Sequence, residues 1–175
     1  MRIAFLVLFA AASALAGEIT LHDQTLPEVK ASVQLPEGWT STMESDEGVF
    51  VYHLQKGTRS GETDAPGITL SITTKVPERT TQSPSQYAAA LIDMSQDDGP
   101  NNPIQKSEIS GLPSLRSEYH FESDKGKMRA VNIAIPNDKT GTLYFFAWQA
   151  PLDEPTAAEA LRDKIVASLK IDPAF

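Results

Sequence analysis

The stretch 115–150 constrains the fold most, because it has the pattern of three antiparallel strands joined by two short turns. A three-residue turn at 124–126 is expected at the first hairpin, since glycine at its end tolerates a positive φ. A five-residue turn at 137–141 is expected at the second. Both registers predict the same inner face, made of Leu115, Ser117, Tyr119, Phe121, Val131, Ile133, Ile135, Leu143, Phe145 and Ala147.

The opposite face of these strands is expected to carry an aromatic ridge next to small residues. The ridge is Tyr144, Phe146 and Trp148, and the small residues are Ala130, Asn132 and Ala134. A strand that is apolar on both sides should be central and covered on both faces. A helix packed on the ridge is the favoured interpretation, and a bound peptide or apolar ligand is the alternative. In that alternative the candidate binding residues are Tyr144, Phe146, Trp148, Asn132 and Trp39, and Trp148 is the one expected to be partly exposed.

Residues 1–16 predict a secretory signal peptide, with Arg2, an apolar run over 3–12 and a small-x-small cleavage site over 14–16. The apolar run is shorter than the roughly 20 residues of a membrane-spanning helix, and no later segment is apolar enough to span. A retained anchor is the alternative. We expect an exported chain, periplasmic or secreted, with no transmembrane segment after signal cleavage.

The charge balance and the lack of cysteine exclude several classes of function. Removing Arg2 with the signal peptide leaves 14 basic residues against 23 acidic ones, a net charge of −9, so nucleic acid and anionic membranes are poor partners. No cysteine is present, which excludes disulfides, a thiol nucleophile and thiolate metal sites. The length suits one domain over 29–175, preceded by a polar lead-in over 17–28 that is expected to be irregular.

Apolar periodicity predicts the remaining elements. Alternating patterns indicate strands over 29–35, 49–54, 68–76 and 104–109. Ser83 and Gln86 predict a capping box at the start of a helix over 83–96, with Tyr87, Leu91 and Met94 as one apolar stripe and Ala88 and Ile92 beside it. Thr156 and Glu159 predict a second capping box, followed by a buried stripe of Ala158, Leu161, Ile165 and Leu169. The order of strands, helix, strands and helix predicts an α+β fold with helices on an antiparallel sheet.

Short motifs in this order resemble the PsbP-like fold family. They are Leu35-Pro36-Glu37-Gly38-Trp39 after the first strand, Gly111-Leu112-Pro113, Asp124-Lys125-Gly126-Lys127 at the first turn and Leu143-Tyr144-Phe145-Phe146 in the last strand. That family includes an extrinsic photosystem subunit, a yeast Ran-binding protein and many exported bacterial proteins of unknown role. The resemblance covers 29–171 and implies an α/β/α sandwich around a twisted antiparallel sheet. It does not imply an activity, since the fold hosts binding and adaptor roles and its known members are mostly not enzymes, and no catalytic motif of the family is present here to carry over.

Two kinds of metal site remain alternatives. His53 and His120 are candidates for a metal or acid–base pair with nearby glutamates. Asp97, Asp98 and Asn101 gather oxygen ligands of the kind that calcium prefers. Separate, singly hydrogen-bonded histidines and a solvated loop are the favoured interpretation of both groups.

The sequence therefore favours an exported, non-enzymatic binding or adaptor protein without a cofactor. It is expected to recognise a protein, a peptide or a small apolar ligand through a sheet face and the polar loop over 55–67. A metal-assisted hydrolase and a calcium-binding accessory subunit are the alternatives.

Overall fold

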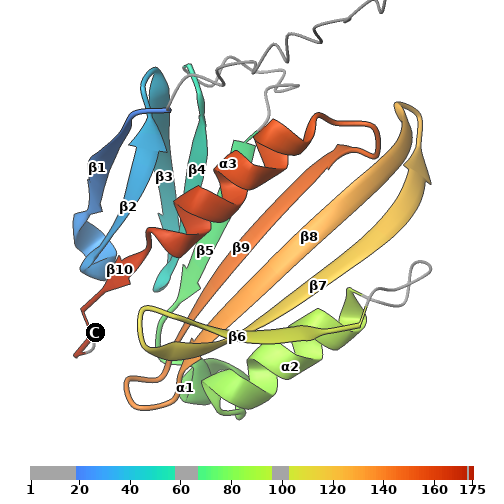
Figure 1. The fold of residues 1–175 in the computed structure, drawn as a ribbon. Coiled ribbons are helices and arrows are strands. Elements are labelled where there is room, and N and C mark those ends of the chain that lie inside the picture. Colours follow the sequence, from blue (N-terminus) through green and yellow to red (C-terminus); the bar gives the residue numbers. More distant parts are fainter. Residues whose placement is uncertain (1–18, 58–66, 96–102, 173) are drawn as a thin grey trace, which may run out of the picture.

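The structure, a computed structural model, describes residues 19–57, 67–95, 103–172 and 174–175. A large sheet contains β3 (Trp39–Asp46), β4 (Val49–Lys56), β5 (Gly67–Thr73), β6 (Gln105–Ile109), β7 (Leu112–Ser123), β8 (Gly126–Asn137) and β9 (Thr142–Pro151). Its seven strands are all antiparallel, in the order β3-β4-β5-β9-β8-β7-β6. A small sheet, in the order β1-β2-β10, contains β1 (Leu21–Leu26), β2 (Ala31–Pro36) and β10 (Lys170–Ile171) (Figure 1).

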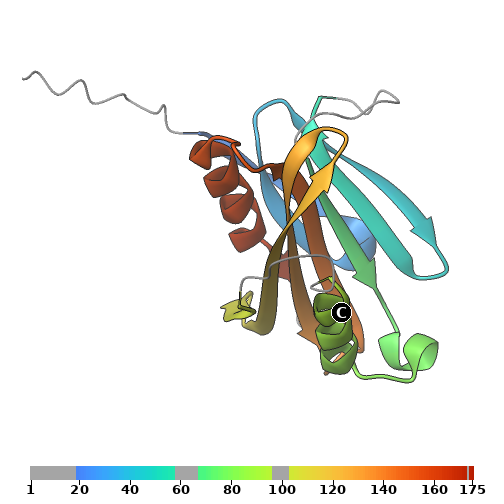
Figure 2. The same cartoon turned by 90° about the vertical axis from the view of Figure 1, so that its right-hand side faces the viewer.

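Helices cover both faces of the large sheet. On one face lie α3 (Thr156–Ala167) and the small sheet, whose β1 and β2 are joined by the 3-10 turn η1 (Pro27–Val29). On the other face lie α1 (Val76–Thr80) and α2 (Pro84–Met94) (Figure 2). This confirms the α+β fold with an α/β/α arrangement around a twisted antiparallel sheet. None of the helices in the described residues is long and apolar enough to cross a membrane.

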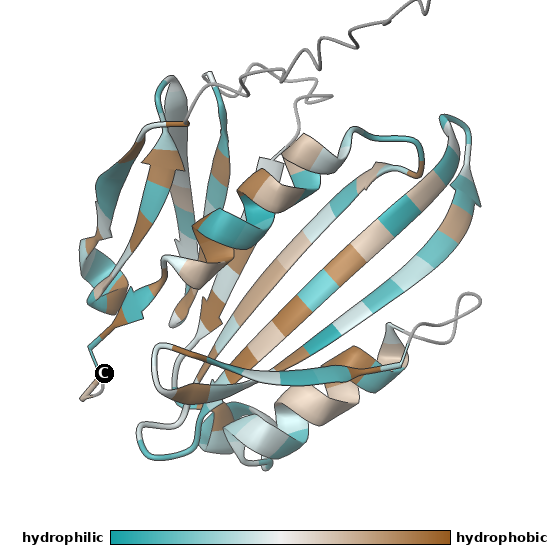
Figure 3. Ribbon diagram, in the orientation of Figure 1, coloured by the Kyte–Doolittle hydropathy of each residue, from teal (hydrophilic) through white to brown (hydrophobic). Residues whose placement is uncertain are grey.

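The main core lies under α3 and the small sheet. Apolar residues alternate with polar ones along the strands (Figure 3), so that one face of β4, β5, β8 and β9 is apolar. Tyr144, Phe146 and Trp148 project from β9 into this core, where they meet Ile165 from α3 and Leu35 from β2. The ridge is therefore covered by a helix, as favoured, and by a second sheet that was not expected.

Both hairpin registers predicted from the sequence are wrong by one residue. Ser123 pairs with Gly126, and Asn137 pairs with Thr142, so each turn is one residue shorter than expected. Because successive side chains point to opposite faces, a slip of one residue turns a whole strand over. Both slips act on β8. Its residues Val131, Ile133 and Ile135 therefore share a face with the aromatic ridge, and Ala130, Asn132 and Ala134 lie on the other face.

Three strands, β1, β3 and the two-residue β10, and one helix, α1, were missed because their side chains carry little apolar signal. The segment expected to be an irregular lead-in contains β1, and β3 forms an edge of the large sheet with mostly exposed side chains. Backbone pairing with β2 and β4 holds these two strands in place. The strand expected over 68–76 ends at Thr73, since Val76 begins α1.

Of the two capping boxes predicted from the sequence, the first is present and the second is not. Ser83 and Gln86 form the expected capping box, with each side chain accepting from the other residue's backbone N–H. Met94, expected in the apolar stripe of that helix, is 68% exposed, whereas Ala88 and Ile92, expected beside the stripe, are fully buried. The second capping box is wrong: Pro155 precedes the first turn of α3 and makes no side-chain cap.

Two buried tyrosines make the fold sensitive to alkali. Burial, with the nearby charge of Asp172 as a smaller cause, raises the pKa of Tyr144 from 10.0 to about 12. Burial also raises the pKa of Tyr52, and so does its hydrogen bond to the Glu28 carboxylate, with 2.8 Å between the two oxygen atoms. In both cases the folded chain holds the neutral phenol more strongly than the unfolded chain does.

Alkaline pH is therefore expected to destabilise the protein. A group whose pKa is raised by folding contributes its full stability below its unfolded pKa and loses it as the pH rises through the folded value. For Tyr144 that window runs from pH 10.0 to about 12. Urea unfolding should show a lower free energy of unfolding at about pH 11 than at about pH 9, and a smaller decline in Tyr144→Phe. An equal decline in the variant would contradict this assignment.

Candidate functional site

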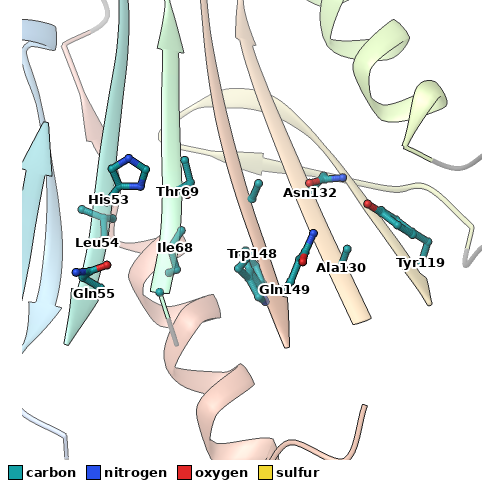
Figure 4. A pocket seen from close by; sticks show the side chains of 12 residues that line it. His53, Leu54, Gln55, Ile68, Thr69, Tyr119, Ala130, Asn132, Trp148 and Gln149 are labelled. Atoms are coloured by element: carbon teal, nitrogen blue, oxygen red, sulfur yellow. The ribbon is translucent and has the colours of Figure 1, made fainter. Parts of the chain in front are cut away.

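On the face opposite the main core, the described helices and strands leave part of the large sheet uncovered. Ala88 and Ile92 of α2 pack on Ala134 and Leu143, where small and apolar side chains allow close contact. Farther along the same strands a pocket of about 340 Å³ opens on the sheet (Figure 4). It is lined by His53, Leu54, Gln55, Gly67, Ile68, Thr69, Tyr119, Ala130, Asn132, Ala147, Trp148 and Gln149.

The pocket crosses five neighbouring strands, from β4 to β7. Strand pairing sets up one row of side chains on this face, formed by His53, Thr69, Ala147, Asn132 and Ser117. A second row contains Gln55, Gly67, Gln149, Ala130 and Tyr119. Leu54, Ile68 and Trp148 line the pocket from strand positions between these rows, and their side chains belong to the main core. The site is thus a shallow floor built from regular strands.

The chemistry of this floor is polar and uncharged. Within the described part of the chain, none of its lining residues is Asp, Glu, Lys or Arg. Amide, hydroxyl and imidazole groups both donate and accept hydrogen bonds. Ala130 and Ala147 leave space between the longer side chains. Such a surface can hold a ligand by several hydrogen bonds.

The five residues predicted to bind a ligand do not lie together in one open site. Tyr144 and Phe146 are fully buried, and Trp148 is 4% exposed, so the expectation that Trp148 is partly exposed is wrong. The guanidinium of Arg116 lies 5.5 Å from the centre of the Trp148 ring, in the core side of the sheet. Trp39 packs against the same core from β3. Two of the five predicted residues, Asn132 and Trp148, line the open pocket. Asn132 does so because the observed register places it on the face opposite the ridge, whereas the Trp148 side chain belongs to the main core.

The two histidines are not brought together. His53 lines the pocket, and His120 lies on the opposite face of β7, where its Nε2 is 3.5 Å from a carboxylate oxygen of Glu118. The combined metal site is therefore wrong: the two residues stand on opposite faces, and β5, β9 and β8 lie between their strands. The described ranges contain no group of three or more His, Cys, Asp or Glu residues that could hold a metal ion. Asp97, Asp98 and Asn101 lie outside the described residues.

Sequence reasoning missed this pocket, although a signal for it was present. His53, Thr69, Asn132 and Gln149 each interrupt a strand with a polar side chain on the face away from the main core. The one-residue error in the predicted register assigned Asn132 to the aromatic face, so the row of side chains that it shares with His53 and Thr69 was not recognised. Pairing β8 with β7 and β9 in the observed register would have placed these polar groups side by side.

Comparisons with known proteins find similarity only in solved structures, since no family model and no curated protein matches this chain. LpqN of Mycobacterium tuberculosis, described as involved in cell envelope biogenesis, matches with a TM-score of 0.59 and 13% identity, covering 90% of this chain and 93% of its own. Cyanobacterial PsbP from Synechocystis matches with a TM-score of 0.58 and 14% identity, over 90% and 95% of the two chains.

The Ran-binding protein Mog1p of Saccharomyces cerevisiae matches with a TM-score of 0.54 and 12% identity, over 88% of this chain and 96% of Mog1p. The chain spans 45% of the length of a further similar structure, from Bacteroides thetaiotaomicron. Identities this low establish the fold and leave the function to the site. With two helical layers around one antiparallel sheet, and with PsbP, LpqN and Mog1p as structural neighbours, this chain has the PsbP-like fold.

Proposed function

We propose that this chain is an exported binding or adaptor protein, and not an enzyme, that holds its partner on the uncovered sheet face and the adjoining loop over 55–67. The observation that supports the proposal is the polar pocket on an otherwise covered sheet. Ligand sites are concave and hold a few polar groups that fix the ligand's orientation, and this pocket places amide, hydroxyl and imidazole groups next to one another.

The loop expected to take part in recognition begins and ends at this pocket. Gln55 and Gly67, its first and last residues, both line the pocket, and residues 58–66 lie outside the described part of the chain. A partner seated on the floor would therefore meet both ends of the loop. The polar lining argues against the small apolar ligand that the sequence left open, and it favours a protein, a peptide or another hydrogen-bonding ligand.

The predicted signal peptide supports export, and the structural neighbours support a binding role. The signal peptide predicted over 1–16 points to the periplasm or the medium. The neighbour LpqN is described as involved in cell envelope biogenesis, and Mog1p is described as binding Ran, so proteins of this fold are associated with envelope and partner-binding roles. We extend such a role to this chain.

A paired substitution tests the proposal. Ala147→Arg places a long side chain on the pocket floor, and Ala160→Arg places the same side chain on the exposed surface of α3. The tagged full chain would be expressed in its source cell, located by fractionation and purified after crosslinking. We expect an envelope or secreted fraction that retains a bound component with wild type and Ala160→Arg, and loses it with Ala147→Arg. Retention of the same component by all three folded proteins, or a cytoplasmic location, would contradict the proposal.

A further inference from the structure

We propose that the pocket on the open sheet face is a binding site for a neutral saccharide. The inference rests on the proposed function, which it makes specific by naming the class of ligand. It follows from three properties of the described lining: the balance of donors and acceptors, the absence of fixed charge, and the position of the pocket in the middle of the sheet.

The donors and acceptors suit hydroxyl groups. The amides of Gln55, Asn132 and Gln149 each offer both a carbonyl oxygen and an NH₂ group, and the hydroxyl of Thr69 both donates and accepts. Neighbouring hydroxyls of a sugar ring also donate and accept hydrogen bonds. Two of them can therefore pair with one side-chain amide, one accepting from its NH₂ group and the other donating to its carbonyl oxygen. A ligand with only acceptors or only donors would leave part of this set unpaired, at a cost in binding.

The charge of the lining suits an uncharged ligand. Asp, Glu, Lys and Arg make up 22% of the chain, yet none of the described lining residues belongs to these types. Phosphate and carboxylate ligands are normally held by Arg or Lys, and cationic ligands by carboxylates. The described floor therefore lacks the fixed ions that a nucleotide, a phosphopeptide or a charged glycan would need.

The position of the pocket disfavours a peptide that adds as a strand. β5, β9 and β8 each pair with a neighbour on both sides, so their backbone N–H and C=O groups are already used in the sheet. A ligand must be recognised by side chains alone. The five strands place the end residues about 19 Å apart, since neighbouring strands lie about 4.8 Å from one another. Tyr119 at one end offers an aromatic ring to the apolar face of a sugar, and the whole length suits an oligosaccharide.

The test uses the mature chain labelled with ¹⁵N and titrated with chitotetraose, cellotetraose and maltotetraose. At least one is expected to shift the backbone amide signals of Thr69, Asn132 and Gln149. Asn132→Ala and Tyr119→Ala are each expected to weaken that binding by about tenfold, as the loss of one good hydrogen bond or stacking contact does. Gln105→Ala removes an equivalent amide from the exposed edge strand β6 and should leave the affinity unchanged.

Other outcomes separate this inference from the proposed function. If none of the three sugars shifts pocket signals while Ala147→Arg still abolishes capture of a component, the saccharide is wrong and the binding function stands. If capture is also unaffected by Ala147→Arg, both fail. Shifts outside the pocket, or affinities equal to those for tetragalacturonate or a Gly-Ser peptide of similar length, overturn the saccharide assignment as well.

Discussion

Glu154→Ala is expected to lower the free energy of unfolding by about 3–5 kcal/mol, because it leaves a buried guanidinium without its carboxylate. Arg162 projects from α3 and is 2% exposed. Its two terminal nitrogen atoms donate to the two carboxylate oxygens of Glu154, at 2.5 and 2.7 Å. A bidentate pair of this kind offsets the cost of removing both charges from water, and one partner alone cannot.

A neighbouring ion pair supplies the control for this prediction. Asp163 pairs with Arg116 at 2.8 Å between Nη1 and Oδ1, but its side chain is 49% exposed. Water solvates either charge when the other is removed, so Asp163→Ala should cost about 1 kcal/mol or less. Urea unfolding of the two variants and the wild type measures both values. Equal and small losses would mean that water reaches Arg162. The double change Glu154→Leu with Arg162→Met should recover most of the loss, since it removes both charges together.

Phe146→Ala is expected to lower the free energy of unfolding by about 3–5 kcal/mol, the usual cost of emptying a buried aromatic site. Phe146 is fully buried in the middle of β9, opposite Leu70 on one side and Ile133 on the other. It lies in the same core cluster as the apolar residues of α3 and β2. Because three layers meet at this position, the surrounding side chains cannot easily collapse into the cavity.

Tyr144→Phe is the matched control for that loss. Tyr144 lies two residues away on the same face of β9, and its hydroxyl has no hydrogen-bond partner within the described part of the chain. Its replacement keeps the ring and removes an unpaired polar atom, so stability near neutral pH should change by less than about 1 kcal/mol. Calorimetry or urea unfolding distinguishes the two results. A loss in Phe146→Ala no larger than that of the control would show that the aromatic ridge is loosely packed.

Glu159 shows why local signals can identify an element and still assign its residues the wrong role. The pattern Thr156 to Glu159 correctly predicts a helix start, yet Glu159 accepts from Arg129, with 2.9 Å between Nη1 and Oε2, and does not cap. A cap depends on residues three positions apart, whereas this ion pair joins residues 30 positions apart. Arg129 of β8 and Arg116 of β7 both lie within ion-pair distance of the Glu159 carboxylate. No pattern in a single helix could have indicated that.

The open pocket was hidden for a similar reason. Polar residues on β4, β5, β8 and β9 are visible in the sequence, but their common row depends on which residues face each other across three strand pairs. One residue of error in each hairpin around β8 moved Asn132 to the aromatic face. The uncovered state of this face depends in addition on α2 ending at Met94 and packing over only part of the sheet.

The sequence by itself determined the α+β class, the strands of the central meander, the capping of α2 by Ser83 and the resemblance to the PsbP-like fold, because apolar periodicity and capping act over a few residues. Tertiary structure alone decided the register of β8, the edge strands β1 and β3 and the partner of Glu159. It also decided which sheet face stays open. These features depend on contacts between residues far apart in the chain. Such contacts form, and stabilise the fold, only when the layers pack together.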